Sequence, residues 1–120
     1  MFTSEEHKRR PERIAELVLR EIASMLVREL RDPRLQGVTL TRARVSADLR
    51  HCRVFFSHLE GASKASVALA GFRCARGFIR QRVGRSLGMR VTPDLSFEFD
   101  PTLENAARID LLLREAASKQ

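Results

Sequence analysis

The amino-acid sequence predicts one two-layered α+β domain, with elements in the order αββααβα and a three-stranded sheet packed on helices. Its 120 residues match the size of a single domain, and its 43% hydrophobic and 31% charged content is typical of a folded chain. Hydrophobic residues recur every three or four positions in the helical segments. In three shorter segments they alternate, as expected for strands. We therefore treat residues 1–120 as one domain, with 1–9 expected to be a flexible N-terminus and 114–120 a frayed C-terminus.

The first helix is predicted over residues 10–31. Pro11 suits the first helical turn, where a missing N–H has no cost. Ile14, Val18 and Ile22 belong to a hydrophobic stripe with helical spacing. The pair Asp32-Pro33 ends the helix, because a residue before proline is pushed out of the helical region.

Two strands, over residues 38–47 and 52–59, follow and form an antiparallel hairpin across the short link Asp48-Leu49-Arg50. Strand alternation separates the side chains into two sets. The inward set is Ala43, Val45, Cys52, Val54 and Phe56. The outward set is Arg42, Arg44, Arg53 and Phe55, which predicts a partly wet, cationic outer face.

A long helical pattern then extends to Gly88, and its interior glycines predict a break or kink near Gly77 that splits it into two helices. Residues 94–100 alternate again and form the third strand. Asp100 is expected to cap a last helix, which starts at Pro101 and runs to about Ser118.

The charge distribution predicts an anionic partner. The chain has 22 lysines and arginines against 15 acids, for a net charge of +7, and only three of the cations are lysines. Residues 51–92 contain eight basic side chains and one acid, Glu60. Guanidinium groups bind phosphate through a planar, bidentate fork, so arginine enrichment favours a nucleic acid.

The candidate site is the arginine-rich stretch around Gly77, where helix ends and glycine would let a phosphate backbone approach closely. Its basic members are Arg73, Arg76, Arg80, Arg82, Arg85 and Arg90. The alternative is an ordinary solvated helix face. Three phenylalanines are candidates for stacking on bases. Phe72 is expected to pack in the core, whereas for Phe55 and Phe78 the sequence allows either core packing or base stacking. The basic run Lys8-Arg9-Arg10 is interpreted as a solubilising end rather than a contact.

Other classes of protein find little support in the sequence. His51 and Cys52 are strand neighbours that point to opposite faces, and Cys74 is expected to be a buried, inert thiol. No phosphate-loop, dinucleotide or metal-ligand spacing occurs, so we expect no enzyme, cofactor, metal or small-molecule substrate. No hydrophobic run approaches bilayer length and no targeting segment is visible, so we expect a cytoplasmic protein without a membrane partner.

Several runs, in one order, resemble the bacterial ribosome-binding factor A family. They are Asp32-Pro33-Arg34-Leu35, Val45-Ser46-Ala47-Asp48-Leu49, Ala75-Arg76-Gly77-Phe78-Ile79-Arg80, Leu87-Gly88-Met89-Arg90-Val91-Thr92-Pro93 and Asp100-Pro101-Thr102-Leu103. The resemblance covers about residues 10–113. Cys52, where alanine is common, and Asn105-Ala106-Ala107, which lacks a usual glycine, depart from the pattern.

The resemblance implies a type II KH-like domain in which an Ala-x-Gly kink, here Ala75-Arg76-Gly77, replaces the usual GxxG loop. It also implies a monomeric, non-catalytic assembly factor that binds the free small (30S) ribosomal subunit. Such factors assist late maturation and 5′ processing of 16S rRNA, above all in the cold. The RNA-binding residues would be Arg73, Ala75, Arg76, Gly77, Arg80, Arg85 and Arg90. The alternatives are a generic KH-like nucleic-acid-binding protein, or a module whose acidic residues 94–115 dock on a ribosomal protein.

Overall fold

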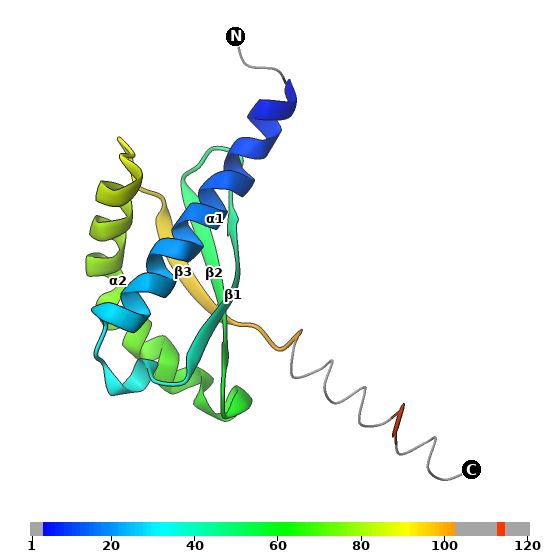
Figure 1. Cartoon of the computed structure of the whole chain (residues 1–120), viewed down its shortest axis with the longest axis vertical. Helices are drawn as coiled ribbons and strands as arrows, with labels where there is room; N and C mark the ends of the chain where they lie inside the picture. Colours follow the sequence, from blue (N-terminus) through cyan, green and yellow to red (C-terminus); the bar gives the residue numbers. More distant parts are fainter. Residues whose placement is uncertain (1–3, 103–112, 115–120) are drawn as a thin grey trace.

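The computed structural model describes the backbone of residues 4–102 and 113–114, with side chains from Arg10 onward. Two long helices, α1 (Ser4–Arg28) and α2 (Ala65–Leu87), accompany the strands β1 (Val38–Val45), β2 (His51–His58) and β3 (Asp94–Phe99). Two short 3₁₀ turns, η1 (Pro33–Leu35) and η2 (Gly61–Lys64), precede β1 and α2. Figure 1 shows the helices against a three-stranded sheet, which confirms the predicted α+β class.

The sheet has the order β1-β2-β3 and mixes two kinds of pairing. β1 and β2 form the predicted antiparallel hairpin, with Ala43 opposite Val54, and a bulge falls between Leu40 and Arg42. β2 and β3 are parallel, with Cys52 opposite Leu95. The parallel pair requires a long crossover, which α2 provides.

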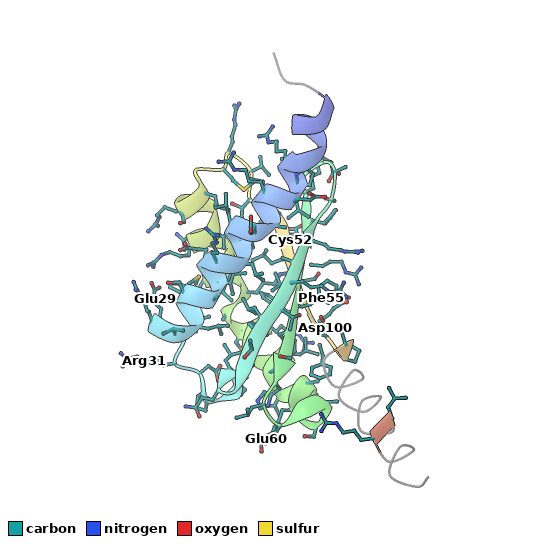
Figure 2. The ribbon with its side chains drawn as sticks, turned by 45° about the vertical axis from the view of Figure 1, so that its right-hand side comes forward. Glu29, Arg31, Cys52, Phe55, Glu60 and Asp100 are labelled. Carbon is teal, nitrogen blue, oxygen red and sulfur yellow. The ribbon has the colours of Figure 1, made fainter. Side chains whose placement is uncertain are left out.

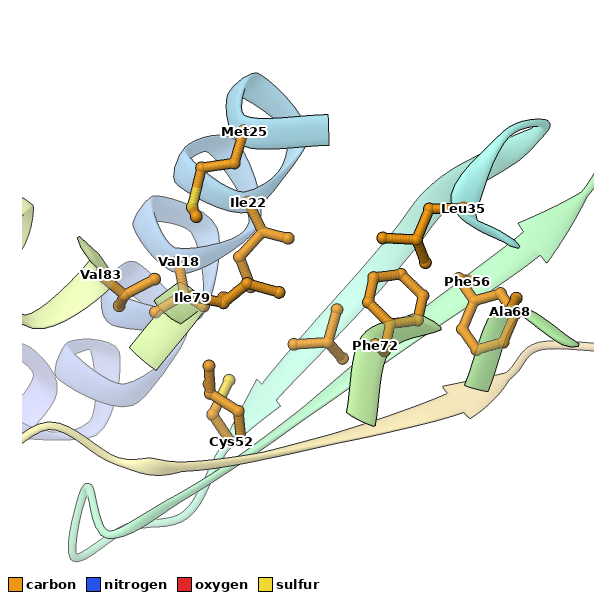
Figure 3. Packing of buried hydrophobic residues seen from close by; sticks show 12 residues of the cluster. Val18, Ile22, Met25, Leu35, Cys52, Phe56, Ala68, Phe72, Ile79 and Val83 are labelled. Carbon is orange, nitrogen blue, oxygen red and sulfur yellow. The ribbon is translucent and has the colours of Figure 1, made fainter. Parts of the chain in front are cut away.

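The hydrophobic core lies between the helices and the inner face of the sheet (Figure 3). Val18, Ile22 and Met25 of α1 meet Phe72 and Ile79 of α2 there, each at most 1% exposed. The inward residues that alternation predicted on β2 are also fully buried: Cys52, Val54 and Phe56. Phenylalanine rings tie the layers together: the Phe72 and Phe97 rings stack with centroids 4.3 Å apart.

Helix α1 starts at Ser4 and ends at Arg28, whereas the sequence predicted 10–31. Pro11 therefore lies inside the helix rather than in its first turn. Proline fixes φ at a helical value, and a helix that packs along the sheet can accommodate the one hydrogen bond it removes. At the other end, Asp32 caps η1: its carboxylate accepts the Arg34 amide at 2.9 Å.

Helix α2 corrects the predicted division into two helices. It is one continuous helix from Ala65 to Leu87, and Gly88 in the left-handed region ends it. Its first and second halves run in different directions (Figure 1), so a bend takes the place of a break. Both halves are anchored in the core, by Phe72 in the first and Val83 in the second. This packing offsets the low helix propensity of the interior glycines.

The chain leaves β3 through Asp100, which is only 4% exposed. Its carboxylate accepts the Thr102 amide at 3.0 Å, as the predicted cap requires, and the Thr41 hydroxyl at 2.8 Å. Hydrogen bonds from Thr102 are the main reason that the Asp100 pKa falls to about 2. Most of the predicted last helix lies outside the described residues.

Candidate nucleic-acid interface

The arginines of α2 divide into exposed and paired groups. Arg73, Arg76 and Arg85 are exposed, and in the described part of the chain no ion pair engages them. Arg82 instead forms an ion pair with Glu29, the residue that directly follows α1. Arg80 donates to the Thr92 carbonyl at 3.0 Å and lies 3.4 Å from the Asp94 carboxylate. The helix thus presents three unpaired guanidinium groups, whereas Arg80 and Arg82 hold α2 against neighbouring elements.

Gly77 lies exposed on the same helix, and the described structure leaves space there for a side chain. A Cβ placed on it would meet no atom within 4 Å. Gly84 differs sharply, because a Cβ there would lie 2.1 Å from the Thr92 hydroxyl oxygen. Gly84 is thus explained by close packing. Gly77 leaves a strip of helix backbone open to solvent, beside Arg76 and the half-buried Ala75.

The three aromatic candidates have different environments. Phe72 is fully buried, as predicted for a core residue. Phe78, next to Gly77, is 47% exposed and can offer its ring to a base. Phe55 is on the outer sheet face but only 7% exposed, so it is not available for stacking.

Arginine side chains cover Phe55. The guanidinium of Arg42 lies 4.2 Å from the ring centroid and that of Arg53 lies 5.4 Å from it, while Arg53 also pairs with Glu98 at 2.7 Å. Figure 2 shows Phe55 with nitrogen-tipped side chains beside it. The predicted cationic outer face is therefore present, with two of its guanidinium groups held over an aromatic ring.

A cleft of about 960 Å³ lies between the N-terminal half of α1, the β1–β2 turn and the segment that joins α2 to β3. Its basic lining is Arg10, Arg50, His51, Arg80 and Arg90, and its acids are Asp48 and Asp94. The cleft brings together Arg80 and Arg90 of the sequence-predicted set, but Arg73, Arg76 and Arg85 do not line it. The sequence did not predict Arg50 as a site residue, and it led us to interpret Arg10 as part of a solubilising N-terminal end. Neither contact was predictable, because no local pattern shows that the N-terminal helix and the hairpin turn lie close together.

The cysteines offer no visible catalytic centre. Cys52 is buried, and burial raises the pKa of its thiol to about 11. Cys74 is exposed, which corrects the prediction of a buried thiol: it lies on α2 between the exposed Arg73 and the half-buried Ala75, off the core stripe. Among residues 4–102 and 113–114, no group of three or more His, Cys, Asp or Glu could hold a metal ion. Nor is any helix in that part of the chain long and apolar enough to cross a bilayer.

The fold and the basic surface define a small α+β domain, with exposed arginines along one helix and at one end of the sheet that have no ion-pair partner among the described side chains. A sequence model described as ribosome-binding factor A matches residues 10–113, and the chain belongs to that family. A ribosome-binding factor A from Syntrophus aciditrophicus is 42% identical over 107 residues, which are 89% of this chain and 87% of the relative. One from Beutenbergia cavernae is 37% identical over 110 residues, or 92% and 69% of the two chains.

Solved structures agree with this assignment. The crystal structure of ribosome-binding factor A from Thermus thermophilus superposes with a TM-score of 0.62 at 24% identity, over 72% of this chain and 92% of the other. That likeness shows the fold. A homology model of the Thermus thermophilus factor, fitted into the cryo-EM map of a 30S complex, gives a TM-score of 0.59 at 25% identity, over 72% of this chain and 91% of the other. A Thermotoga maritima solution structure gives 0.58 at 28% identity, over 72% and 79%.

Proposed function

We propose that this protein is a non-catalytic assembly factor that binds the free small ribosomal subunit and assists late maturation of its 16S rRNA. The observation that carries the proposal is the bent helix α2, which exposes Arg73 and Arg76 beside the open backbone of Gly77, and Arg85 further along the same helix. Unpaired guanidinium groups next to an unobstructed backbone suit a phosphate chain, which would be held by charge and shape rather than by base reading.

Family membership supports the choice of partner, because a Thermus thermophilus relative has been fitted into a 30S complex. In this proposal the protein acts in the cytoplasm as a monomer, without a small-molecule substrate or a membrane partner. Its greatest importance would be in the cold, and the step it assists would include processing at the 5′ end of 16S rRNA. The RNA-binding set is Arg73, Ala75, Arg76, Gly77, Arg80, Arg85 and Arg90, with Arg80 acting through the position of α2.

Co-sedimentation tests the partner. Purified protein is mixed with immature small subunits, mature small subunits, large subunits and 70S particles, and each mixture is pelleted through sucrose. We expect pelleting with free small subunits alone, lost as salt rises. Equal binding to all particles, or similar affinity for duplex DNA, would favour a generic nucleic-acid-binding protein. Binding that survives high salt and nuclease treatment would favour docking on a ribosomal protein.

A charge-matched pair of variants tests the surface. Arg73→Gln with Arg76→Gln should weaken small-subunit binding and reduce the slope of log K against log salt by about 1.5, since two phosphate contacts are lost. The control, Arg20→Gln with Arg44→Gln, removes the same charge from exposed positions on α1 and the outer sheet face. If both variants lose affinity equally, net charge rather than this surface governs binding.

A further inference from the structure

We infer that the cleft at the end of the sheet is a second RNA-binding site, which holds a short single-stranded segment by its phosphates. The inference rests on the proposed function, since it assigns the same partner class to a surface that shares only Arg80 and Arg90 with the set proposed above. The cleft is defined by Arg10 and Ile14 of α1, residues 48–51 of the hairpin, Arg80, and residues 87–92 and 94. Gly77 does not line it.

The charge balance of the cleft favours an anion. Its two acids already have partners: Asp94 lies beside Arg80, and Asp48 accepts the Ser46 hydroxyl at 2.6 Å and the Arg50 amide at 3.0 Å. Three guanidinium groups have no ion-pair partner among the residues whose side chains the structure describes. They are those of Arg10, Arg50 and Arg90, from three separate elements. Guanidinium groups that converge from three directions can contact successive phosphates of a chain.

The hairpin turn that carries Arg50 is rigid and strained. Leu49 has φ of 62°, the one positive value at a non-glycine residue in the described chain. A branched side chain adopts this left-handed conformation at a cost, which persists where the surroundings enforce it. Here the Leu49 amide donates to the Ser46 carbonyl at 2.9 Å, and the Asp94 amide donates to the Arg50 carbonyl at 2.8 Å. The strained turn is thereby joined to the start of β3, and the backbone of Arg50 is held at the cleft wall.

The remaining lining explains why a nucleotide fits better than a simple anion. Leu49, Leu87, Met89 and Val91 add hydrophobic surface to the cleft, and Val91 is 68% exposed. A base or ribose can cover such surface while the phosphates reach the arginines. The volume of about 960 Å³ lies at the upper end of the range for small-ligand sites, which leaves room for more than one nucleotide.

The test titrates the isotope-labelled full chain with hexauridylate at low salt and follows its backbone amide NMR signals. We expect shifts at residues 49–51 and 88–92, and at least tenfold weaker binding for Arg50→Gln with Arg90→Gln. The kink variant, Arg73→Gln with Arg76→Gln, should keep the shifts in the cleft. The control, Arg20→Gln with Arg44→Gln, should bind like the wild type.

Three results would overturn the inference. If the amide signals shift only for residues around Gly77, hexauridylate does not bind in the cleft. Wild-type affinity in Arg50→Gln with Arg90→Gln would show that its arginines do not bind RNA. If hexaglutamate binds as tightly as hexauridylate, the cleft is a site for an acidic protein segment rather than for RNA. Small-subunit co-sedimentation of the wild type separates the two proposals: a wild-type protein that pellets with small subunits but shows no hexauridylate shifts in the cleft refutes the cleft and leaves the assembly-factor function intact.

Discussion

Replacing Gly77 by alanine should make the protein more stable and a weaker RNA binder. Alanine is favoured over glycine by about 1 kcal/mol in a helix interior. At Gly77 nothing opposes this gain, since the added Cβ meets no atom within 4 Å. For a domain of about 100 residues, 1 kcal/mol corresponds to a rise in melting temperature of roughly 4–8 °C. We therefore expect Gly77→Ala to melt several degrees above the wild type.

The expected effect on binding has the opposite sign. If a phosphate backbone contacts the open strip of helix at Gly77, a methyl group there holds the two backbones apart. This separation should break one charge-assisted hydrogen bond between a neighbouring guanidinium and a phosphate, which costs about 1.5–3 kcal/mol. Affinity for the small subunit should therefore fall roughly 10- to 150-fold. Thermal melts and co-sedimentation at fixed salt, on the same preparation, measure both quantities.

Gly84→Ala is the matched control on the same helix. Its Cβ would lie 2.1 Å from the Thr92 hydroxyl oxygen and 3.3 Å from the Thr92 Cβ, so the variant should lose about 1–3 kcal/mol of stability through overpacking. A Gly77→Ala protein that is stabilised and binds normally would refute the idea that RNA approaches this backbone. One that is destabilised would show that the bend in α2 itself needs glycine.

Three further predictions concern single side chains. The low pKa of Asp100, about 2 against the usual 3.8, stabilises the fold fully above about pH 4, and this contribution is lost as pH falls toward 2. Asp100→Asn should therefore lose about 1–2 kcal/mol at pH 7 and show a flatter stability profile between pH 4 and 2 in urea melts. Phe78→Ala should weaken RNA binding by about 1–3 kcal/mol with little change in melting temperature, whereas Phe78→Tyr should bind normally; equal binding of all three proteins would exclude stacking. At pH 8 a maleimide should modify Cys74 alone, and Cys52 only after unfolding, because its thiol is buried and its pKa is near 11; rapid double labelling of the folded protein would contradict this.

Local patterns were sufficient to predict the sheet and its inner face. Strand alternation placed Cys52, Val54 and Phe56 inward, and all three are buried. The same alternation put Phe55 outward, yet Phe55 is only 7% exposed, because Arg42 of the adjacent β1 and Arg53 of its own strand cover its ring. Strand alternation predicts on which face of the sheet a side chain lies, but it does not predict whether long neighbouring side chains, such as arginines, cover it.

The errors come from interactions between distant segments. Glycine propensity predicted a break or kink that would give two helices, but contacts of both halves with the core keep α2 one continuous, bent helix. The cleft was not predictable either, because Arg10, Arg50 and Arg90 are about forty residues apart and only the packing of α1, the hairpin and the α2–β3 segment brings them together. Charge density along the sequence therefore points to the arginines of one helix and to Arg90, but it does not indicate a cleft assembled from three segments.

Arg80 connects the two proposed RNA surfaces, and this affects how either can be tested. By sequence it belongs with Arg73 and Arg76 on α2, but its guanidinium holds the Thr92 carbonyl and lies beside Asp94 at the cleft. Replacing it would release the segment that carries Arg90 and leave Asp94 without its cation. Loss of binding in an Arg80 variant would therefore not distinguish phosphate contact from altered position. Two sites on the same domain also increase each other's affinity for a single RNA, because once one site is bound the second contact forms at a high effective concentration. The kink variant and the cleft variant should thus each weaken small-subunit binding far more than binding of hexauridylate at the other site.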